Sequence, residues 1–535
     1  MPRARAKPAA LEPIISLNPA TLEEIGRVMP TPPSDLEAIV AEAQRAQRRW
    51  AAMSPKERGF AIKRASDYVR YNHAHIAELI ARENGKPLTE AYLMEVLPVV
   101  DTFAYVARYA AKILEPERVH DPQLFYKTKK HYLERPPIGV VGIISPWNYP
   151  FTIPAGEVAI ALAAGNAVIL KPAPITPLVG EWIKKAFDAA GLPAGLLTVA
   201  HGDAEIGQAM CEHPGIGKIF FTGSVEVGRK VASVCGPMLK PYVLELGGKD
   251  AAIVCADADL DRAARGVLWG GAANAGQTCS GIERVYVSDQ IWDPFLDRIT
   301  ALAGRLTPGD PLDPATQVGP FAAPEQYDIV HGQVEDALVR GAKRHTGGPA
   351  DTGMPGKWYA PAVVTQVDHS MPLMRDETFG PVIPMMPFAD ENEAVAFAND
   401  SEYGLGASVW SRDRDRAVSL ARRLEAGSIW VNDHMYSHAA AQLPWGGVKK
   451  SGVGVTHSKH GFYETTQMRL ISVDAGRFTA PWWHPYDERL RAGFTALLDS
   501  LYAPGVAGKL GAAARHRKEW RGLIDRVREM GRGAL

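Results

Sequence analysis

Short apolar runs alternate with longer amphipathic stretches from about residue 139 onward. Strands of a parallel sheet are buried on both faces, so they read as nearly continuous apolar runs rich in β-branched residues. The runs that fit this description are GVVGIIS, NAVILKP, LLTVAHG, KIFFTG and PYVLELGG. A second series begins near residue 250 and includes ERVYVSD, ASVWSRD and SIWVND. The pattern predicts an α/β fold made of two successive sets of βαβ units.

The N-terminal part of the chain is predicted to be helical. The segments SDLE (34–37) and SPKE (54–57) both have the spacing of a capping box, in which a serine and a glutamate satisfy the first free N–H groups of a helix. In the second segment a proline also stands at the first helical position, where its missing N–H costs nothing. The helix that contains HIAELIARENGKP is expected to end near Gly85.

The chain from about residue 475 to its end has the pattern of two amphipathic helices. It carries eleven Lys or Arg and six Asp or Glu, a net charge of +5. We favour packing of the apolar stripes on the protein's own surface or on a neighbouring subunit. The alternative places the basic faces on an anionic membrane surface, with Trp482, Trp483 and Tyr486 at the interface. The two stripes consist of Leu490, Phe494, Leu497, Leu498 and Leu501, and of Trp520, Leu523, Ile524, Val527 and Met530.

Length, composition and charge place this chain among ordinary globular proteins. Its 535 residues are too many for one hydrophobic core and predict two or three domains. A net charge of −1 gives no indication of a nucleic-acid or membrane partner. Four cysteines without close pairing predict neither a disulfide framework nor a zinc site, which fits a reducing compartment. The basic N-terminus lacks the apolar segment of a signal peptide, and we expect a cytoplasmic protein.

Four predicted strands run directly into residues that can carry chemistry. In parallel α/β sheets, ligands gather beyond the carboxyl ends of the strands. A ligand site is therefore expected where these segments meet. The segments are Pro146-Trp147-Asn148, Lys171-Pro172, Thr222-Gly223-Ser224 and Glu245-Leu246-Gly247-Gly248.

Each of these features taken alone also has an ordinary structural explanation. The dinucleotide fingerprint G-x-G-x-x-G is absent, and FTGSVEVG (221–228) fits a common strand-to-helix turn better than a pyrophosphate cradle. Lys171 fits a ribose or phosphate contact and a solvated lysine about equally. Glu245 alone is better explained as a salt-bridged or capping carboxylate than as a base. Cys279 alone is better explained as an inert buried thiol.

Taken together, the segments resemble the aldehyde dehydrogenase superfamily. The motifs appear in the order of that family with similar spacing, and they cover most of residues 20–472. Glu245 and Cys279, for example, are 34 positions apart. The motifs are PWNYPF (146–151), GNAVILKP (165–172), FTGSVEVG (221–228), ELGGKD (245–250), GQTCSG (276–281), ETFGPV (377–382) and PWGGVKKSGVG (444–454).

The resemblance implies a role for each matching residue. Cys279 is implied as the nucleophile that attacks the aldehyde carbonyl, because a thiolate is the most nucleophilic side chain near neutral pH. The Asn148 amide and the Cys279 N–H would form the oxyanion hole, and Glu245 would activate water to hydrolyse the thioester. The cofactor residues would be Ser145, Pro146, Trp147, Lys171, Thr222, Gly223, Ser224, Gly228, Leu246, Gly247, Glu377 and Phe379. The substrate tunnel would contain Tyr149, Ile153, Gly156, Thr278, Ser280 and Tyr436.

Two positions depart from the family pattern. Members that prefer NAD often have a ribose-binding glutamate where this chain has Pro174, so the choice between NAD and NADP is open. Glu157 stands where many relatives have lysine, and the sequence gives no account of it.

No arginine stands out in the expected tunnel, and we assign Arg284 to the strand behind Cys279. These features favour an apolar aliphatic or aromatic aldehyde over a semialdehyde acid.

The resemblance also implies a domain organisation and a homodimer or homotetramer. Residues 1–124 and 143–246 would form a Rossmann-type dinucleotide-binding domain, and residues 247–446 the catalytic α/β domain. Residues 125–142 and 466–474 would form a β arm that pairs with a neighbouring subunit, followed by the helical extension 475–535. Two alternative functions use the same scaffold. In one the acyl group passes to coenzyme A, which Glu245 disfavours because a thiol acceptor needs no activated water. In the other the protein is a silent binding or structural protein, which would have lost Cys279, Glu245 or Asn148.

Overall fold

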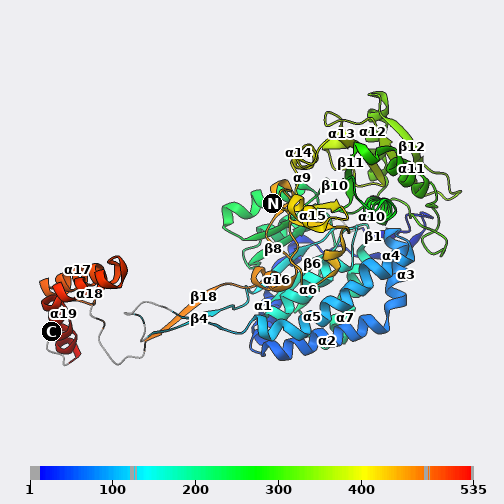
Figure 1. Cartoon of the computed structure of the whole chain (residues 1–535). Coiled ribbons are helices and arrows are strands. Elements are labelled where there is room, and N and C mark those ends of the chain that lie inside the picture. The colour runs from blue at the N-terminus through cyan, green and yellow to red at the C-terminus, as the bar shows by residue number, and fades with distance from the viewer. Residues whose placement is uncertain (1–11, 121–125, 127–128, 475–479, 481, 532–535) are drawn as a thin grey trace, which may run out of the picture. The chain divides into compact units, whose positions relative to one another are not determined.

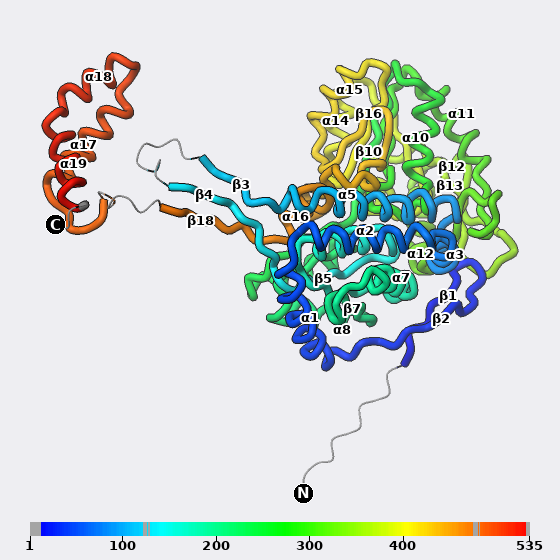
Figure 2. The backbone as a smooth tube through the Cα atoms, turned by 90° about the horizontal axis from the view of Figure 1, so that it is seen from below, coloured from blue at the N-terminus to red at the C-terminus, as the bar shows by residue number. Residues whose placement is uncertain are grey.

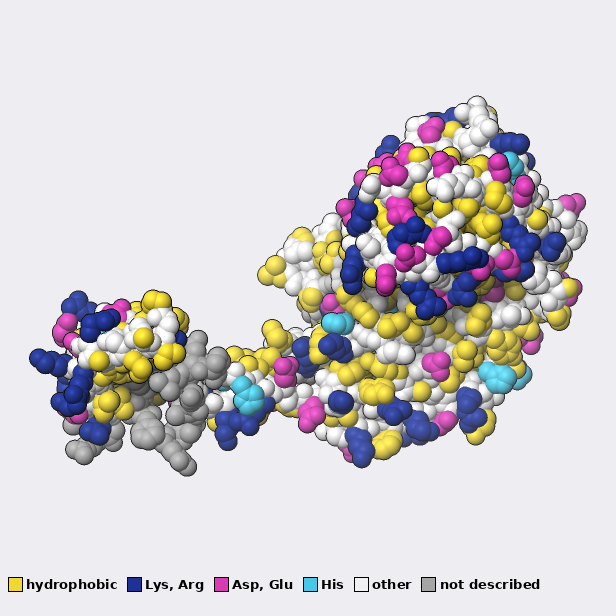
Figure 3. All heavy atoms as spheres, viewed as in Figure 1, with side chains coloured by type: hydrophobic (Ala, Val, Ile, Leu, Met, Phe, Trp, Pro, Cys, Tyr) yellow, Lys and Arg dark blue, Asp and Glu magenta, His cyan; other side chains and the backbone are white. Residues whose placement is uncertain are grey.

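The computed structural model describes residues 12–120, 126, 129–474, 480 and 482–531. These divide into two compact units, one from residues 1–115 and 135–468 and the other from residues 116–134 and 469–535. The larger unit contains two open sheets with helices on their faces (Figure 1). On the face drawn in Figure 3, basic and acidic side chains of this unit are interspersed, in agreement with the net charge of −1.

The first sheet is largely parallel, with the order β17-β9-β8-β5-β6-β7. The chain goes from β5 outward to β6 and β7, and then returns to the other side of β5 to add β8 and β9. This reversal opens a crevice beyond the carboxyl ends of β5 and β8, where doubly wound sheets bind ligands. The strands are β5 (Val140–Ile144), β6 (Ala167–Lys171), β7 (Leu197–Val199), β8 (Lys218–Thr222), β9 (Tyr242–Glu245) and the antiparallel β17 (Gly452–Val453).

Helices cover both faces of this sheet. Helix α2 lies beside α5 and α7 in both ribbon views (Figures 1 and 2). A π-helical turn, Tyr92–Val96, joins α4 directly to α5. The helices are α1 (Leu36–Ala51), α2 (Pro55–Tyr71), α3 (His73–Asn84), α4 (Leu88–Ala91), α5 (Leu97–Ile113), α6 (Thr152–Ala164), α7 (Pro177–Ala189), α8 (Ala204–Glu212), α9 (Val225–Cys235) and α16 (Ser458–Glu464).

The second sheet has the order β12-β13-β14-β11-β10-β15-β16, and only β12 is antiparallel to its neighbour. Its strands are β10 (Asp250–Val254), β11 (Ile282–Ser288), β12 (Lys343–Pro349), β13 (Tyr359–Thr365), β14 (Val382–Phe388), β15 (Gly406–Trp410) and β16 (Ser428–Val431). Its helices are α10 (Leu260–Ala272), α11 (Trp292–Ala303), α12 (Pro324–Val339), α13 (Pro372–Arg375), α14 (Glu391–Asn399) and α15 (Arg414–Ala421). A separate hairpin precedes α1 and consists of β1 (Ile14–Leu17) and β2 (Glu24–Val28).

The local helix signals succeed at two of three places. Ser54 and Glu57 form the expected capping box, and α3 ends where Gly85 adopts a left-handed backbone with φ 91°. The box expected at Ser34 is wrong. Pro33 opens a 3₁₀ turn, Pro33–Asp35, that places Ser34 inside it, so α1 begins after Asp35 without a side-chain cap.

The smaller unit combines a three-stranded antiparallel sheet with a helical bundle. The sheet has the order β18-β4-β3, and it includes β3, which the sequence pattern did not indicate. The segment 125–142, predicted for the arm, extends too far along the chain, because Val140 already belongs to β5 of the first sheet. The elements are β3 (Glu117–Val119), β4 (Lys129–Glu134), β18 (Arg469–Asp474), α17 (Glu488–Tyr502), α18 (Gly505–Arg515) and α19 (Arg517–Gly531).

The tail packs differently from the predicted stripes. Leu490, Leu497 and Leu523 are buried, but Leu498 and Ile524 are 59% and 48% exposed. Arg526 is buried in the bundle instead, and its guanidinium donates to Asp487 Oδ2 at 2.6 Å. Among the helices of the described ranges, none combines the length and the apolar composition needed to cross a bilayer.

Candidate active site

Cys279 lies in a tightly bent loop between α10 and β11. Asn274 and Ala275 both have φ of 54°, a left-handed backbone that non-glycine residues seldom adopt. Gly276 is also left-handed, and a Cβ on it would lie 2.1 Å from the carbonyl carbon of Gly380. Such backbone strain persists only where surrounding contacts hold it, and it is concentrated at functional sites.

Asn148 follows β5 and lies against this loop. Its side-chain Nδ2 donates to the carbonyl oxygen of Gln277 at 3.1 Å. Its own carbonyl accepts hydrogen bonds from Asn274 Nδ2 at 3.0 Å and from Lys86 Nζ at 2.9 Å. The amide of Asn148 and the loop that carries Cys279 are therefore held together although they are 131 positions apart in the chain (279 − 148).

Glu245 is the last residue of β9 and is buried, with 6% of its surface exposed. Neither carboxylate oxygen has a hydrogen-bond partner among the described residues. Burial raises the pKa of Glu245 well above its usual range, and the nearby carboxylates of Glu157 and Glu464 raise it further, against the opposing effect of the Thr456 hydroxyl. An unpartnered carboxylate with a raised pKa is suited to accept a proton from a bound molecule.

The motif PWGGVKKSGVG, to which the sequence analysis assigned no role, supports the Glu245 turn. Ser451 Oγ donates to the carbonyl of Gly247 at 2.7 Å, and the Ser451 carbonyl accepts from Leu246 N at 2.9 Å. Gly452 of β17 pairs with Glu245 of β9, and a Cβ on Gly452 would lie 2.2 Å from the Leu244 carbonyl oxygen. Only glycine allows β17 to approach β9 this closely.

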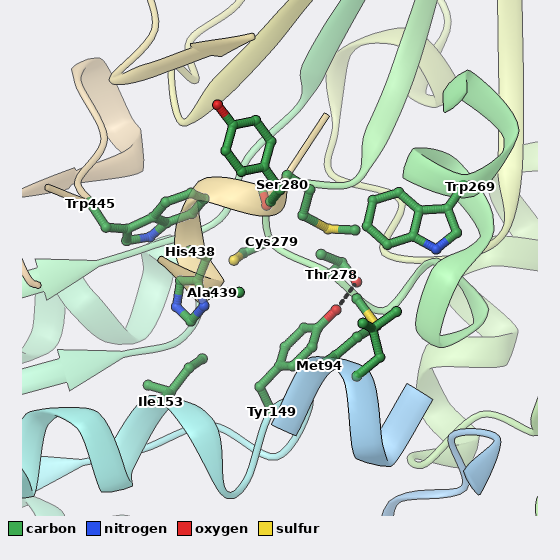
Figure 4. A pocket seen from close by; sticks show the side chains of 13 residues that line it. Met94, Tyr149, Ile153, Trp269, Thr278, Cys279, Ser280, His438, Ala439 and Trp445 are labelled. Atoms are coloured by element: carbon green, nitrogen blue, oxygen red, sulfur yellow. Dashed lines mark hydrogen bonds between the residues drawn. The ribbon is translucent and has the colours of Figure 1, made fainter. Parts of the chain in front are cut away.

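Two cavities, one apolar and one more polar, meet at Cys279, and this residue lines both. Figure 4 shows the apolar cavity. The apolar cavity is lined by Leu93, Met94, Tyr149, Ile153, Trp269, Thr278, Cys279, Ser280, Met435, Tyr436, His438, Ala439 and Trp445. The polar cavity is lined by Pro146, Trp147, Asn148, Thr222, Gly223, Ser224, Glu245, Leu246, Gly247, Cys279, Gln326, Ile329, Glu377 and Phe379.

The polar cavity brings together the three expected catalytic residues and most of the expected cofactor residues. Three of the latter lie outside its lining: Ser145, Lys171 and Gly228. Lys171 is buried at the end of β6, and burial lowers its pKa to about 8, against the opposing effect of Asp203. Ser145 Oγ donates to the Lys171 carbonyl at 3.4 Å, so these two residues lie together at the ends of the neighbouring strands β5 and β6.

The polar cavity fits a dinucleotide. Helix α9 begins at its edge, and helix N-termini bind phosphate through free N–H groups. The buried hydroxyl of Thr222 has no hydrogen-bond partner among the described residues, which leaves it available to a ligand. A Cβ on Gly247 would lie 2.4 Å from Glu377 Oε2. Because glycine has no Cβ, the backbone can approach this carboxylate closely, and also a ligand that the carboxylate binds. Phe379 also lines this cavity.

The loop that carries Glu377 and Phe379 is fixed to the strand behind Cys279. The Glu283 carboxylate accepts from the N–H groups of Thr378 and Phe379, each at 2.7 Å, and pairs with Lys249 Nζ at 2.7 Å. As expected, Arg284 belongs to that strand, and its Nε donates to the carbonyl of Lys249 at 2.9 Å. The guanidinium therefore has a structural position and faces neither cavity.

The environment of Cys279 opposes ionisation of its thiol. Burial raises its pKa first, and the carboxylates of Asp250, Glu377 and Glu245 raise it further. These surroundings therefore disfavour the thiolate in the protein alone. A cationic group in the polar cavity, or transfer of the proton to a neighbouring base, would be needed to form the thiolate.

Five of the six expected tunnel residues line the apolar cavity. Gly156 does not, because the nearest atom to a Cβ there would be Thr102 Cγ2 of α5 at 3.7 Å. Tyr149 and Thr278 share a hydrogen bond of 2.8 Å (Figure 4). The sequence pattern did not indicate the lining residues supplied by the π-helical turn, by α10 and by the loop after β16. These are Leu93, Met94, Trp269, Met435, His438, Ala439 and Trp445.

A model of the aldehyde dehydrogenase family matches residues 6–471. A betaine aldehyde dehydrogenase of Sinorhizobium fredii is 38% identical over 88% of this chain and 95% of its own. An NAD-dependent aldehyde dehydrogenase structure from Sinorhizobium meliloti is 34% identical over 90% of this chain and 95% of its own, with a TM-score of 0.85. An NADP-dependent enzyme from E. coli is 32% identical over 86% and 95%, with a TM-score of 0.83.

Proposed function

Because this chain belongs to the aldehyde dehydrogenase family, an NAD(P)-dependent group of oxidoreductases, we propose that it oxidises an aldehyde to a carboxylic acid through an acyl intermediate on Cys279. One observation carries this proposal. Cys279 lies where an apolar cavity, suited to an organic substrate, meets a polar cavity suited to a dinucleotide. A sulfur in that position can reach the substrate from one side while the cofactor lies on the other.

In the first step the Cys279 thiol loses its proton to water, and the resulting thiolate attacks the aldehyde carbonyl. A C–S bond forms, and the electron pair of the C=O double bond moves to oxygen. The Asn148 amide keeps one N–H on the Gln277 carbonyl, and its second N–H is assigned to this oxyanion together with the N–H of Cys279. Each such donor contributes on the order of 3 kcal/mol to transition-state stabilisation in analogous enzymes.

The residues around the polar cavity would hold the cofactor, and the N-terminus of α9 would bind its pyrophosphate. Ser224 caps this helix by accepting from Val227 N at 3.3 Å, and its O–H remains a donor for a phosphate oxygen. We assign ribose contacts to Glu377 and Lys171. When bound, the nicotinamide supplies the acceptor for the hydride that leaves as the oxyanion becomes a carbonyl again. Pro174 offers no carboxylate to repel a 2′-phosphate, so both NAD and NADP fit this chain.

Glu245 then accepts a proton from water, whose oxygen attacks the thioester. The new C–O bond replaces the C–S bond, and the Cys279 thiolate and the carboxylic acid are released. The burial that raises the pKa of Glu245 makes its carboxylate a stronger base than an exposed one.

The pH dependence of turnover tests the role of Glu157. Burial raises the pKa of Glu157 to about 8, and its charge raises the pKa of Glu245. A base works only when deprotonated, so kcat should rise with pH through the pKa of Glu245. Glu157→Gln removes a neighbouring negative charge and is expected to move this rise to lower pH.

The pH profile of kcat measures this shift. Glu83→Gln is the matched control, because burial also raises the pKa of Glu83 to about 7, yet it is hydrogen-bonded to Ser16, Leu178 and Val179 and lines neither cavity. It should leave the profile in place. A rise that stays where it was in Glu157→Gln, or that moves to higher pH, would contradict coupling between the two carboxylates.

The apolar cavity indicates an uncharged, apolar aldehyde. Among its described lining residues none is Lys, Arg, Asp or Glu. Burial, and then His457, lowers the pKa of His438 to about 3, so this imidazole is neutral. A second candidate substrate is betaine aldehyde, after the names of similar proteins. Aromatic rings in the lining could bind its cation. Lys86 Nζ, however, already lies 4.0 Å from the ring centre of Tyr149, which disfavours a second cation there.

A substrate panel with NAD and with NADP tests the proposed function. We expect oxidation of hexanal and benzaldehyde, with kcat/KM at least ~10-fold above that of a semialdehyde acid, because the cavity offers no partner for a carboxylate. A kcat/KM for betaine aldehyde that exceeds those of the apolar aldehydes would establish the second candidate instead. No oxidation of any of these with either cofactor would contradict the proposed reaction.

The arm supports assembly into a homodimer or homotetramer. The outer strands β3 and β18 have no neighbour on one side among the described residues, and Leu470 and Val473 on β18 are exposed. An open strand edge with exposed apolar residues is a template for pairing with a second chain.

Four free cysteines are consistent with the reducing cytoplasm that we assign as the location of this protein.

A further inference from the structure

A buried ion pair lies directly behind Asn148. Lys86 precedes α4, Glu95 lies in the π-helical turn, and their Nζ and Oε1 atoms are 2.6 Å apart with both side chains fully buried. Removing two charges from water costs more than their attraction returns unless further hydrogen bonds satisfy them. The hydrogen bonds that these two side chains make beyond their own contact therefore indicate what the pair does.

Those hydrogen bonds go to Asn148 itself and to the residues that follow it. Lys86 Nζ donates to the Asn148 carbonyl at 2.9 Å. Glu95 Oε2 accepts from the N–H groups of Phe151 at 3.2 Å and Thr152 at 2.7 Å, which open helix α6. The pair thus fixes the backbone at Asn148 itself and at the start of the helix that follows it.

The same N-terminal segment also reaches the loop of the nucleophile. Glu90 Oε2 accepts from the N–H of Asn274 at 2.9 Å. Asn274 Nδ2 in turn donates to the carbonyls of Asn148 and Gln277, each at 3.0 Å. Both sources of the assigned oxyanion donors, the Asn148 turn and the Cys279 loop, are therefore anchored to residues 86–95.

The π-helical turn makes this double contact possible. Such turns insert an extra residue into a helix and are frequent at functional sites. Here Leu93 and Met94 line the apolar cavity, while the next residue, Glu95, is directed into the interior toward Lys86. One short segment therefore contributes to the substrate cavity and to the support of Asn148.

We infer that Lys86 and Glu95 are positioning residues that set the orientation of the Asn148 amide for transition-state stabilisation. This inference rests on the proposed role of Asn148 as an oxyanion donor. Neither side chain lines the polar cavity, so the pair acts through the backbone of Asn148. Because oxyanion contacts form in the transition state, loss of the pair should lower kcat and leave the KM for the aldehyde nearly unchanged.

The test is a double-mutant cycle with Asn148→Ala. Lys86→Met combined with Glu95→Gln removes both charges together, keeps similar volumes and leaves an acceptor for the Phe151 and Thr152 amides. We expect this paired variant to lower kcat/KM by ~10- to 100-fold, somewhat less than the ~100- to 1,000-fold expected for loss of a donor in Asn148→Ala. In the Asn148→Ala background the paired change should cost less than about threefold, because interacting residues are not additive.

Two further measurements separate positioning from general damage. The Kd for the cofactor, measured by fluorescence, should be the same in the paired variant and the parent. Lys240→Met is the matched control, because Lys240 is also a buried lysine and donates to the carbonyls of Cys211 at 2.5 Å and His213 at 2.7 Å, remote from Asn148. Its effect should be the same with and without Asn148. If the paired variant does not fold, Glu95→Gln alone replaces it in the cycle.

Each outcome decides the inference. Equal fold-losses from the paired change in the parent and in Asn148→Ala would overturn it, and so would a rise in the KM for the aldehyde at constant kcat. If Asn148→Ala itself left kcat/KM unchanged, the oxyanion assignment would fail and the positioning role with it. Strong coupling to Asn148, absent for Lys240→Met, is the result that supports it.

Discussion

Cys279→Ala is expected to abolish aldehyde oxidation, with a loss in kcat of at least ~10⁴-fold, as for other enzymes that lose their nucleophile. Alanine cannot form the covalent adduct from which the hydride departs, and none of the other cysteines lines either cavity. Formation of reduced cofactor with a substrate that the parent oxidises measures the loss. The Kd for the cofactor should change little, because the other residues that line the polar cavity remain in place.

Cys255→Ala is the matched control for this variant. Cys255 is buried beside the second sheet, and burial raises the pKa of its thiol to about 12. Its removal should leave the kinetics nearly unchanged. Turnover that survives in Cys279→Ala would instead mean that the chain does not use this sulfur, and a silent binding protein on the same scaffold would explain the cavities equally well.

Glu245→Gln is expected to separate the two halves of the reaction. The adduct and the acyl intermediate can still form, so a rapid burst of about one reduced cofactor per active site should remain. Steady-state turnover should then fall by ~10²- to 10⁴-fold, the usual contribution of a positioned base. Rapid-mixing kinetics measure both phases in a single experiment.

Coenzyme A provides the informative control for this variant. If water is the natural acceptor, adding coenzyme A to the parent should give the free acid and no acyl-CoA. An acyl-CoA product, with steady-state turnover unaffected by Glu245→Gln, would establish acyl transfer to a thiol in place of hydrolysis. The unpartnered, buried carboxylate of Glu245 has no task in that alternative.

The parts of the site that follow buried strands could be predicted from the sequence. Asn148 and Glu245 come directly after continuous apolar runs, and the ends of those strands converge at the reversal between β5 and β8. Cys279 could be placed only by the company of these residues, because its own flanking sequence also fits an inert thiol. The resemblance to a family supplied the roles, and the geometry brings the three residues around one cavity.

The substrate cavity could not be predicted to the same degree, because its walls come from distant segments. Trp269 is on α10, His438 lies on a loop after β16, and Met94 is on the π-helical turn. No periodic pattern links such residues before the chain is folded. Gly156 shows the converse error, since a position expected in the tunnel instead faces α5.

Buried charges were the other signal that the sequence concealed. Lys86 and Glu95 lie in a segment of ordinary helical composition, in which charged residues are usually solvated. Only the fold shows that their side chains are directed inward. The tail was misjudged for a related reason. Arg526, a charged residue, takes a central buried place in the bundle that periodicity would have given to an apolar side chain.

The most direct test of the central claim is to trap the acyl group on the protein. Glu245→Gln would be mixed with a good aldehyde substrate and NAD or NADP, quenched in acid during the burst and digested for mass spectrometry. The account predicts that the peptide containing Cys279 is heavier by the mass of the acyl group, in proportion to the reduced cofactor formed. Reduced cofactor without any acylated Cys279, or acylation at another residue, would contradict it.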